Sequence, residues 1–211
     1  MSTGAINGYA GLWFQTLGMT TEQIGIIFAL PIIGVVLAGI PVGRLADRAS
    51  DWRYVIVGGA LLSAIISFAL LVVEGFIALL IVWTLAVVMR TVISPVIDAA
   101  AIRHSRREDG NFGGLYAWKT VGYLATVSGT GLLVGQVGIV AFLPAFLAME
   151  ALRGLCALLL PRFRATPSPV RKARPHWIKS ANRALLLPLF GWALVHCTHS
   201  ILNAFLGACR T

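Results

Sequence analysis

Long apolar runs alternate with short polar segments along this chain of 211 residues. Two of the runs, 23–42 and 54–73, flank the polar segment 43–53. Each has about the 20 residues with which a helix crosses the hydrocarbon core of a bilayer. Further runs predict helices over 76–100, 115–134 and 139–160, and a shorter apolar stretch covers 4–17. The pattern therefore predicts a bundle of six membrane helices.

Local signals predict where the second helix begins and ends. Residues 18–20 predict a turn. Thr21 followed by Glu22 is typical of a helix start, because the hydroxyl caps free amides and the acid lies in the first turn. Gly43 predicts the end of this helix, which then covers 22–43 with two prolines inside it. Prolines are tolerated in membrane helices because neighbouring groups satisfy the freed backbone.

The chain changes character after residue 160. Residues 161–183 are rich in proline and in basic side chains and contain no apolar run, which predicts a linker. An apolar segment resumes near Ala184 and continues almost to the end. We therefore expect a helical bundle over 1–160, in which the first helix is truncated, a linker over 161–183, and the truncated start of a second bundle over 184–211.

Composition supports a membrane protein. Hydrophobic residues make up 58% of the chain, charged residues only 12%, and the mean hydropathy is +0.84. A soluble domain of this size does not need so much apolar surface. The predicted fold class is an all-α membrane protein.

The net charge of +9 follows the predicted topology. Most of the 17 basic residues fall in three alternate loops, 43–53, 103–107 and 162–183, whereas the loops between them carry only Glu22 and Glu74. Basic loops stay on the cytoplasmic side of a membrane. The charge therefore predicts cytoplasmic basic loops in an inner (plasma) membrane and argues against a nucleic-acid partner.

The polar segment 43–53 carries a pattern of its own. Gly43, Asp47, Arg48 and Arg53 fill most of the arrangement G-x-x-x-D-R-x-x-x-R/K, with Ser50 where a second glycine is usual and the last base displaced. This arrangement resembles the loop between the second and third helices of the major facilitator superfamily, in which it acts as a gate. The alternative is an ordinary cytoplasmic loop with an acid in it by chance.

Two more segments resemble one branch of that superfamily, the phenylpropionate and nucleoside proton symporters. The helix over 76–100 contains Arg90 and ends in a P-x-x-D-A sequence with Asp98. The next helix starts with an aromatic and glycine pattern around Trp118, but Tyr116 replaces an arginine and Lys119 a glycine. Lys119 either restores a positive charge on a neighbouring face or extends to the cytoplasmic surface. The resemblance makes Arg90, Asp98, Trp118 and Lys119 candidates for the substrate or proton pathway.

Glu150 and Arg153 complete the candidate pathway. They are three residues apart in the helix over 139–160, so they can pair on one face. Ionisable groups inside a membrane are costly and usually functional. The pair is either part of a proton relay or a structural pair whose charges offset each other.

Other motifs do not indicate an enzyme. The three cysteines form no C-x-x-C motif, and His196 and His199, three apart, have no third metal ligand near them. The glycines around Thr130 lie in a predicted membrane helix, which favours close helix packing over a dinucleotide loop. We expect no cofactor, no metal and no catalytic nucleophile.

The resemblance implies the six-helix N-terminal half of a twelve-span facilitator, followed by a truncated seventh helix. Such proteins bind a substrate between two halves near the midplane and work by alternating access. The implied function is secondary transport of a small organic solute, by proton symport, with the lipid bilayer and a second half or a second copy as partners. The alternative is a truncated, non-transporting membrane protein or an assembly module.

Overall fold

A computed structural model describes residues 2–107, 112–161 and 163. Apart from Pro161 and Phe163, the predicted linker 161–183 and the segment 184–211, with His196 and His199, lie outside the described residues. The described part is helical throughout, as the apolar pattern predicted. Its helices are α1 (Ser2–Thr16), α2 (Thr21–Arg48), α3 (Trp52–Phe68), η1 (Ala69–Leu71), α4 (Phe76–Val92), α5 (Ser94–Arg107), α6 (Phe112–Val137), η2 (Ile139–Ala141) and α7 (Phe142–Leu158).

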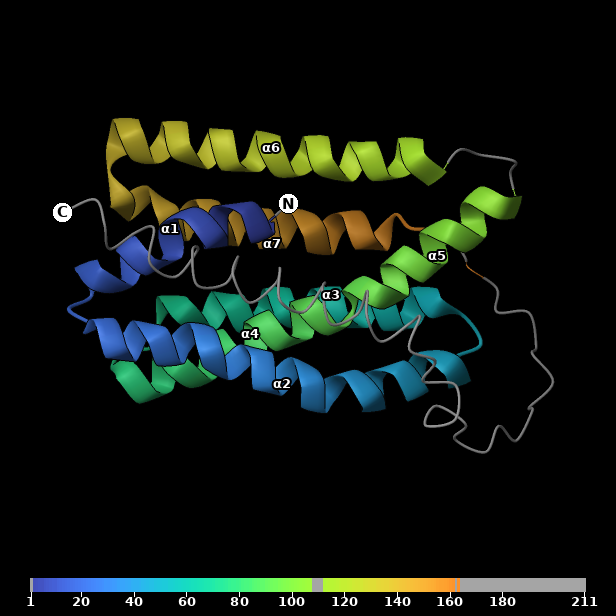
Figure 1. Ribbon diagram of the computed structural model, residues 1–211, viewed down its shortest axis with the longest axis horizontal. Coiled ribbons are helices and arrows are strands. Elements are labelled where there is room, and N and C mark those ends of the chain that lie inside the picture. The colour runs from blue at the N-terminus through green and yellow to red at the C-terminus, as the bar shows by residue number, and fades with distance from the viewer. Residues whose placement is uncertain (1, 108–111, 162, 164–211) are drawn as a thin grey trace, which may run out of the picture.

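The helices form an up-and-down bundle (Figure 1). α3 packs against both α4 and α7, and α2 packs on the other side of α4. α1 packs against α6 and α7, and α6 lies along one edge of the bundle (Figure 1). α3 therefore joins α4, which carries Arg90, to α7, which carries Glu150 and Arg153.

Four helical segments in the described part are long and apolar enough to cross a membrane. They are Thr21–Arg48, Trp52–Leu71, Phe76–Ser105 and Ile139–Leu158. α1, with 15 residues, is shorter than the ~20 residues that a span needs. α6 has 26 residues but is not among the four. The chain is a multi-pass membrane protein, although two of the six predicted spans do not meet this criterion.

The predicted boundaries of the second helix were wrong at both ends. Thr20, not Thr21, is the N-cap: its hydroxyl accepts from the Gln23 amide, and the Gln23 side chain accepts from the Thr20 amide. The helix then continues beyond Gly43 to Arg48. A single glycine lowers helix propensity but does not end a helix when the following residues favour it.

The predicted single helix over 76–100 is interrupted. α4 ends at Val92, and α5 starts at Ser94 and extends to Arg107. Pro95 explains the break, because its ring clashes with the carbonyl group four residues earlier and it has no amide hydrogen to donate. The interruption lies just beyond Arg90 and gives α5 a direction of its own (Figure 1).

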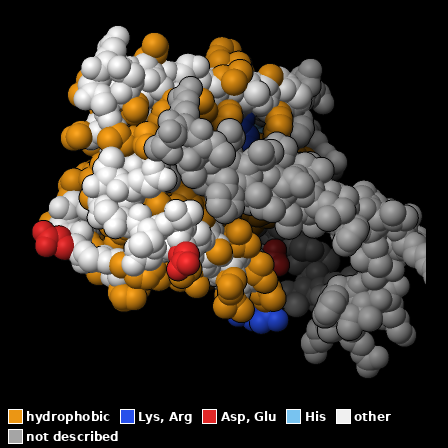
Figure 2. All heavy atoms as spheres, turned by 60° about the vertical axis from the view of Figure 1, so that its left-hand side comes forward, with side chains coloured by type: hydrophobic (Ala, Val, Ile, Leu, Met, Phe, Trp, Pro, Cys, Tyr) orange, Lys and Arg blue, Asp and Glu red, His pale blue; other side chains and the backbone are white. Residues whose placement is uncertain are grey.

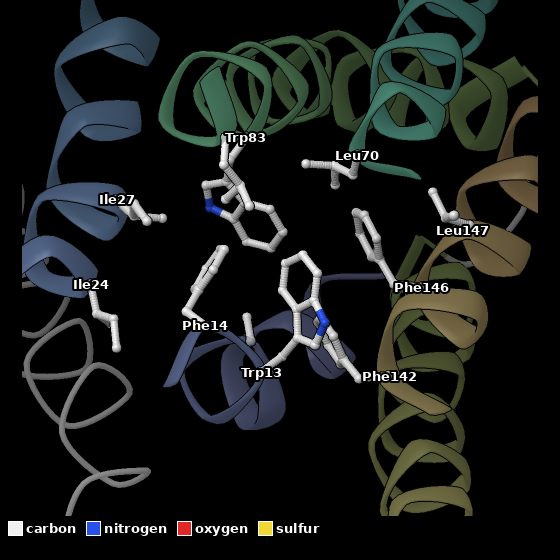
Figure 3. Packing of buried hydrophobic residues seen from close by; sticks show 11 residues of the cluster. Trp13, Phe14, Ile24, Ile27, Leu70, Trp83, Phe142, Phe146 and Leu147 are labelled. Carbon is white, nitrogen blue, oxygen red and sulfur yellow. The ribbon is translucent and has the colours of Figure 1, made fainter. Parts of the chain in front are cut away.

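Two apolar clusters occupy opposite ends of the bundle. The first is aromatic and joins the end of α1 to the beginnings of α4 and α7 (Figure 3). Its Trp83 ring lies 4.9 Å from Phe14 and 5.8 Å from Phe146, between ring centroids. The second cluster joins Ala46, Ile56, Ile93, Val96, Ala100 and Phe163. It lies at the end where α2 and α5 finish and α3 begins, which we call the basic end (Figure 1).

Candidate functional site

Glu150 of α7 is the centre of a charged cluster between the two apolar clusters. Its side chain is fully buried. An Arg153 guanidinium nitrogen, one helical turn along, lies 3.2 Å from its Oε2, so the spacing predicted this pair correctly. Arg90 of α4 approaches the other oxygen at 3.6 Å, and only 9% of the Arg90 side chain is exposed. Arg90 therefore has an acidic partner inside the bundle.

Ser63 of α3 completes the cluster. Its hydroxyl lies 3.1 Å from Glu150 Oε2 and 3.3 Å from the Ala86 carbonyl oxygen of α4, and it can donate to either. Ser67, one turn further, donates to the Ser63 carbonyl oxygen. The sequence analysis missed both serines. The available signal was their four-residue spacing in an otherwise apolar helix, which places two hydroxyls on one buried face.

The hydrogen-bonding capacity of the cluster is not exhausted. Arg153 Nε and Nη2 and Glu150 Oε1 are buried without a hydrogen bond, although Nη2 and Oε1 make the ion pairs above. Two guanidinium groups face one carboxylate. The cluster therefore carries a formal charge of +1 and has buried donors to spare, and these two properties determine what it can bind.

Asp98 and Lys119 pair with each other, away from Glu150. The Lys119 ammonium lies 3.0 Å from Asp98 Oδ1 and 5.0 Å from the centre of the Tyr116 ring, so α5 and α6 are joined here. Both charged side chains are about half exposed, at 42% and 50%. Trp118 is 74% exposed on α6. The structure thus does not bring these three candidates to the buried cluster.

The residues of the loop motif divide into two groups. Asp47 and Arg48 are exposed at the basic end. Arg53 instead donates to the Leu158 carbonyl oxygen, at 2.8 Å, and so ties the start of α3 to the end of α7. Gly43 lies within α2 and does not form a turn.

Asp51, next to this motif, was not among the predicted site residues. Its carboxylate caps α3 by accepting from the Arg53 amide at 2.9 Å, and it accepts from the Phe163 amide at 3.0 Å. An acid directly before a helix is a recognisable capping signal. Its second contact spans 112 residues and gave no signal in the sequence.

Comparison with known proteins identifies the family. The sequence profile of the MFS_1 like family matches residues 1–206. The chain belongs to this family. The match bears out the major facilitator superfamily that the loop motif indicated, whereas the branch of proton symporters stays a prediction.

A sugar permease is among the similar proteins. The maltose permease of Geobacillus stearothermophilus is 26% identical to this MFS_1 like chain over 146 residues. These residues make up 69% of the chain and 37% of the permease, so the chain matches little more than a third of that relative's length. No solved structure matches the chain. Within the described residues, no group of three histidine, cysteine or acidic side chains is placed to hold a metal ion.

Proposed function

We propose that this chain takes part in secondary transport of a small organic solute, coupled to protons, by alternating access. The observation that carries the proposal is the buried cluster of Arg90, Glu150 and Arg153. Charges inside a membrane protein are costly and are usually retained for ion or substrate pathways. A carboxylate of α7 that pairs with Arg90 of α4 and with Arg153 of its own helix is suited to couple proton binding to helix movement.

Proton binding at Glu150 would weaken contacts on three helices at once. Its carboxylate is shared by Arg153 of α7, Arg90 of α4 and Ser63 of α3. Neutralising it removes the attraction to both guanidinium groups, which favours a different packing of these helices. A ligand moves such an equilibrium only through its differential affinity for the two arrangements. A proton at Glu150 provides that difference.

The proposal includes the position of the chain in the membrane. Apolar side chains cover much of the described surface (Figure 2), and Leu37, Val36 and Leu159 are examples exposed by 71%, 67% and 85%. Part of this surface contacts lipid, and part faces a second six-helix unit, since alternating access rocks two units about a shared site. The basic end lies in the cytoplasm of a cell whose plasma (inner) membrane holds the protein.

The test compares variants in the cells that naturally produce the protein, so that any partner is present. Uptake of maltose, nucleosides and aromatic acids is measured for the unchanged chain, for Glu150→Gln and for Arg44→Gln, which removes an exposed charge at the basic end. We expect one class of solute to depend on a pH gradient, with uptake reduced at least tenfold in Glu150→Gln and unchanged in Arg44→Gln. Equal uptake of every solute by all three would refute the proposal.

A further inference from the structure

The charges of the buried cluster do not balance. Arg90 and Arg153 contribute two positive charges and Glu150 one negative charge. The other acids of the described residues lie elsewhere: Asp98 pairs with Lys119, Asp51 caps α3 at the basic end, and the rest are exposed. A guanidinium group without a counter-ion is unfavourable inside a bundle that crosses a membrane. An anion that enters the cluster therefore meets two guanidinium groups that share a single carboxylate.

The unused donors specify what kind of anion fits. Arg153 Nε and Nη2 are buried without a hydrogen bond, and Glu150 accepts a hydrogen bond from Ser63. A guanidinium group presents its N–H groups as a planar fork that matches the two oxygens of a carboxylate. A neutral hydroxyl group would satisfy one donor but could not take the place of Glu150 as a counter-ion.

We propose that Arg90 and Arg153 bind the carboxylate of an organic anion, and that Glu150 holds that place while no substrate is bound. This inference rests on the proposed transport function and names its substrate class. As the anion enters, the Glu150 carboxylate takes one proton from water. The formal charge of the cluster is +1 before and after, because one negative charge is neutralised as another arrives. The two events are thereby linked one to one.

Arg153 is the first contact for the entering anion. Its side chain is 27% exposed, whereas Arg90 is 9% and Glu150 not at all. Apolar side chains around Trp83 and Phe146 pack toward one end of the bundle, and those around Ile93 toward the other. The anion therefore meets Arg153 before it displaces Glu150 from Arg90.

Binding is measured on the purified full chain in neutral detergent, by thermal unfolding in the presence of benzoate, of its neutral counterpart benzamide, or of chloride at the same ionic strength. A ligand that binds only the folded state raises the unfolding temperature. We expect benzoate alone to raise it. We also expect Arg153→Gln to lose the response, and Arg44→Gln, which removes an exposed guanidinium, to keep that of the unchanged chain.

Glu150→Gln gives the sharpest contrast. Without benzoate this variant should unfold at a lower temperature, since two arginines lose their counter-ion. With benzoate it should respond at a concentration roughly tenfold lower, because no internal carboxylate competes. If it does not fold, proton uptake by the unchanged chain in weak buffer replaces it, with about one proton expected per benzoate bound.

The inference is overturned by equal shifts with benzoate and benzamide, by an unchanged response in Arg153→Gln, or by benzoate binding without proton uptake. A shift with chloride as large as with benzoate would assign the cluster to inorganic anions and would also overturn it. Transport of a neutral solute with no benzoate response leaves the proposed function standing and removes this inference. A benzoate response without solute uptake in cells supports this inference and contradicts the proposed transport function.

Discussion

At the scale of single residues, Glu150 is the acid that joins the buried charges of the bundle. It is the one fully buried acid in the described helices, and three helices contact its carboxylate. The exposed pair of Asp98 and Lys119 has a shorter separation, 3.0 Å, but is largely solvated. Burial, rather than distance, decides which pair matters, because water screens the exposed charges.

Replacing Glu150 by Ala should therefore lower the free energy of unfolding by ~3–5 kcal/mol, since it leaves two arginines without their counter-ion. Replacing Lys119 by Ala, in the exposed pair, should cost no more than ~1 kcal/mol. Unfolding of the purified chain in mixed detergent micelles measures both. Similar losses of unfolding free energy in the two variants would show that the buried cluster stabilises the protein no more than the exposed pair does.

At the scale of elements, small residues set how closely the helices approach. Gly34 of α2 faces Val88 of α4: a Cβ at Gly34 would lie 2.5 Å from the Val88 Cγ2 atom. Gly131 of α6 faces the Tyr9 hydroxyl of α1 in the same way, at 2.7 Å. Of the glycines near Thr130, Gly131 thus serves helix packing, as the sequence predicted, whereas a Cβ at Gly129 or Gly135 would meet nothing within 4 Å. Packing of this kind drives helix association where no hydrophobic effect operates between helices.

Gly34→Ala should destabilise the α2–α4 contact by ~1–3 kcal/mol, because Val88 is β-branched and has little rotamer freedom to move away. Gly39→Ala, in the same helix, is the matched control: a Cβ there meets nothing within 4 Å. Its stability should stay the same or rise slightly, as alanine favours a helix. Thermal unfolding of the two variants gives the comparison, and a larger loss at Gly39 would contradict it.

At the scale of the whole molecule, charge and apolar surface are arranged along the bundle axis. The turns that carry the basic motif and the end of α5 lie at one end, and the turns next to Glu22 and Glu74 at the other (Figure 1). Many large apolar side chains are exposed between them, and apolar side chains recur over the face in Figure 2. This distribution predicts a single orientation in the membrane, with the basic end in the cytoplasm.

Single-cysteine labelling tests the orientation. In a chain whose own cysteines have been replaced, Glu74→Cys should react with a membrane-impermeant maleimide in intact cells. Arg48→Cys should react only after the cells are permeabilised. Labelling of Arg48→Cys in intact cells would reverse the assignment, and labelling of both would indicate a mixed orientation.

The sequence by itself determined the helices and their membrane character, because both follow from local properties. An apolar run of about 20 residues has few alternatives to a membrane helix. The Glu150–Arg153 pair was predictable for the same reason, since residues three apart share a helix face. Boundaries were less certain: Gly43 did not end α2, whereas Pro95 interrupted a helix and the two prolines of α2 did not.

Only the tertiary structure decided which distant residues meet. Arg90 and Ser63 contact Glu150 from other helices, although they are 60 and 87 residues away from it in the sequence. Asp51 accepts a hydrogen bond from the amide of Phe163 across 112 residues. Asp98 pairs with Lys119 and not with the buried cluster around Glu150. Each contact depends on how the helices rotate and cross when their side chains pack. A pattern along one helix gives the face that is buried, but the partner on that face is fixed by the packing of the others.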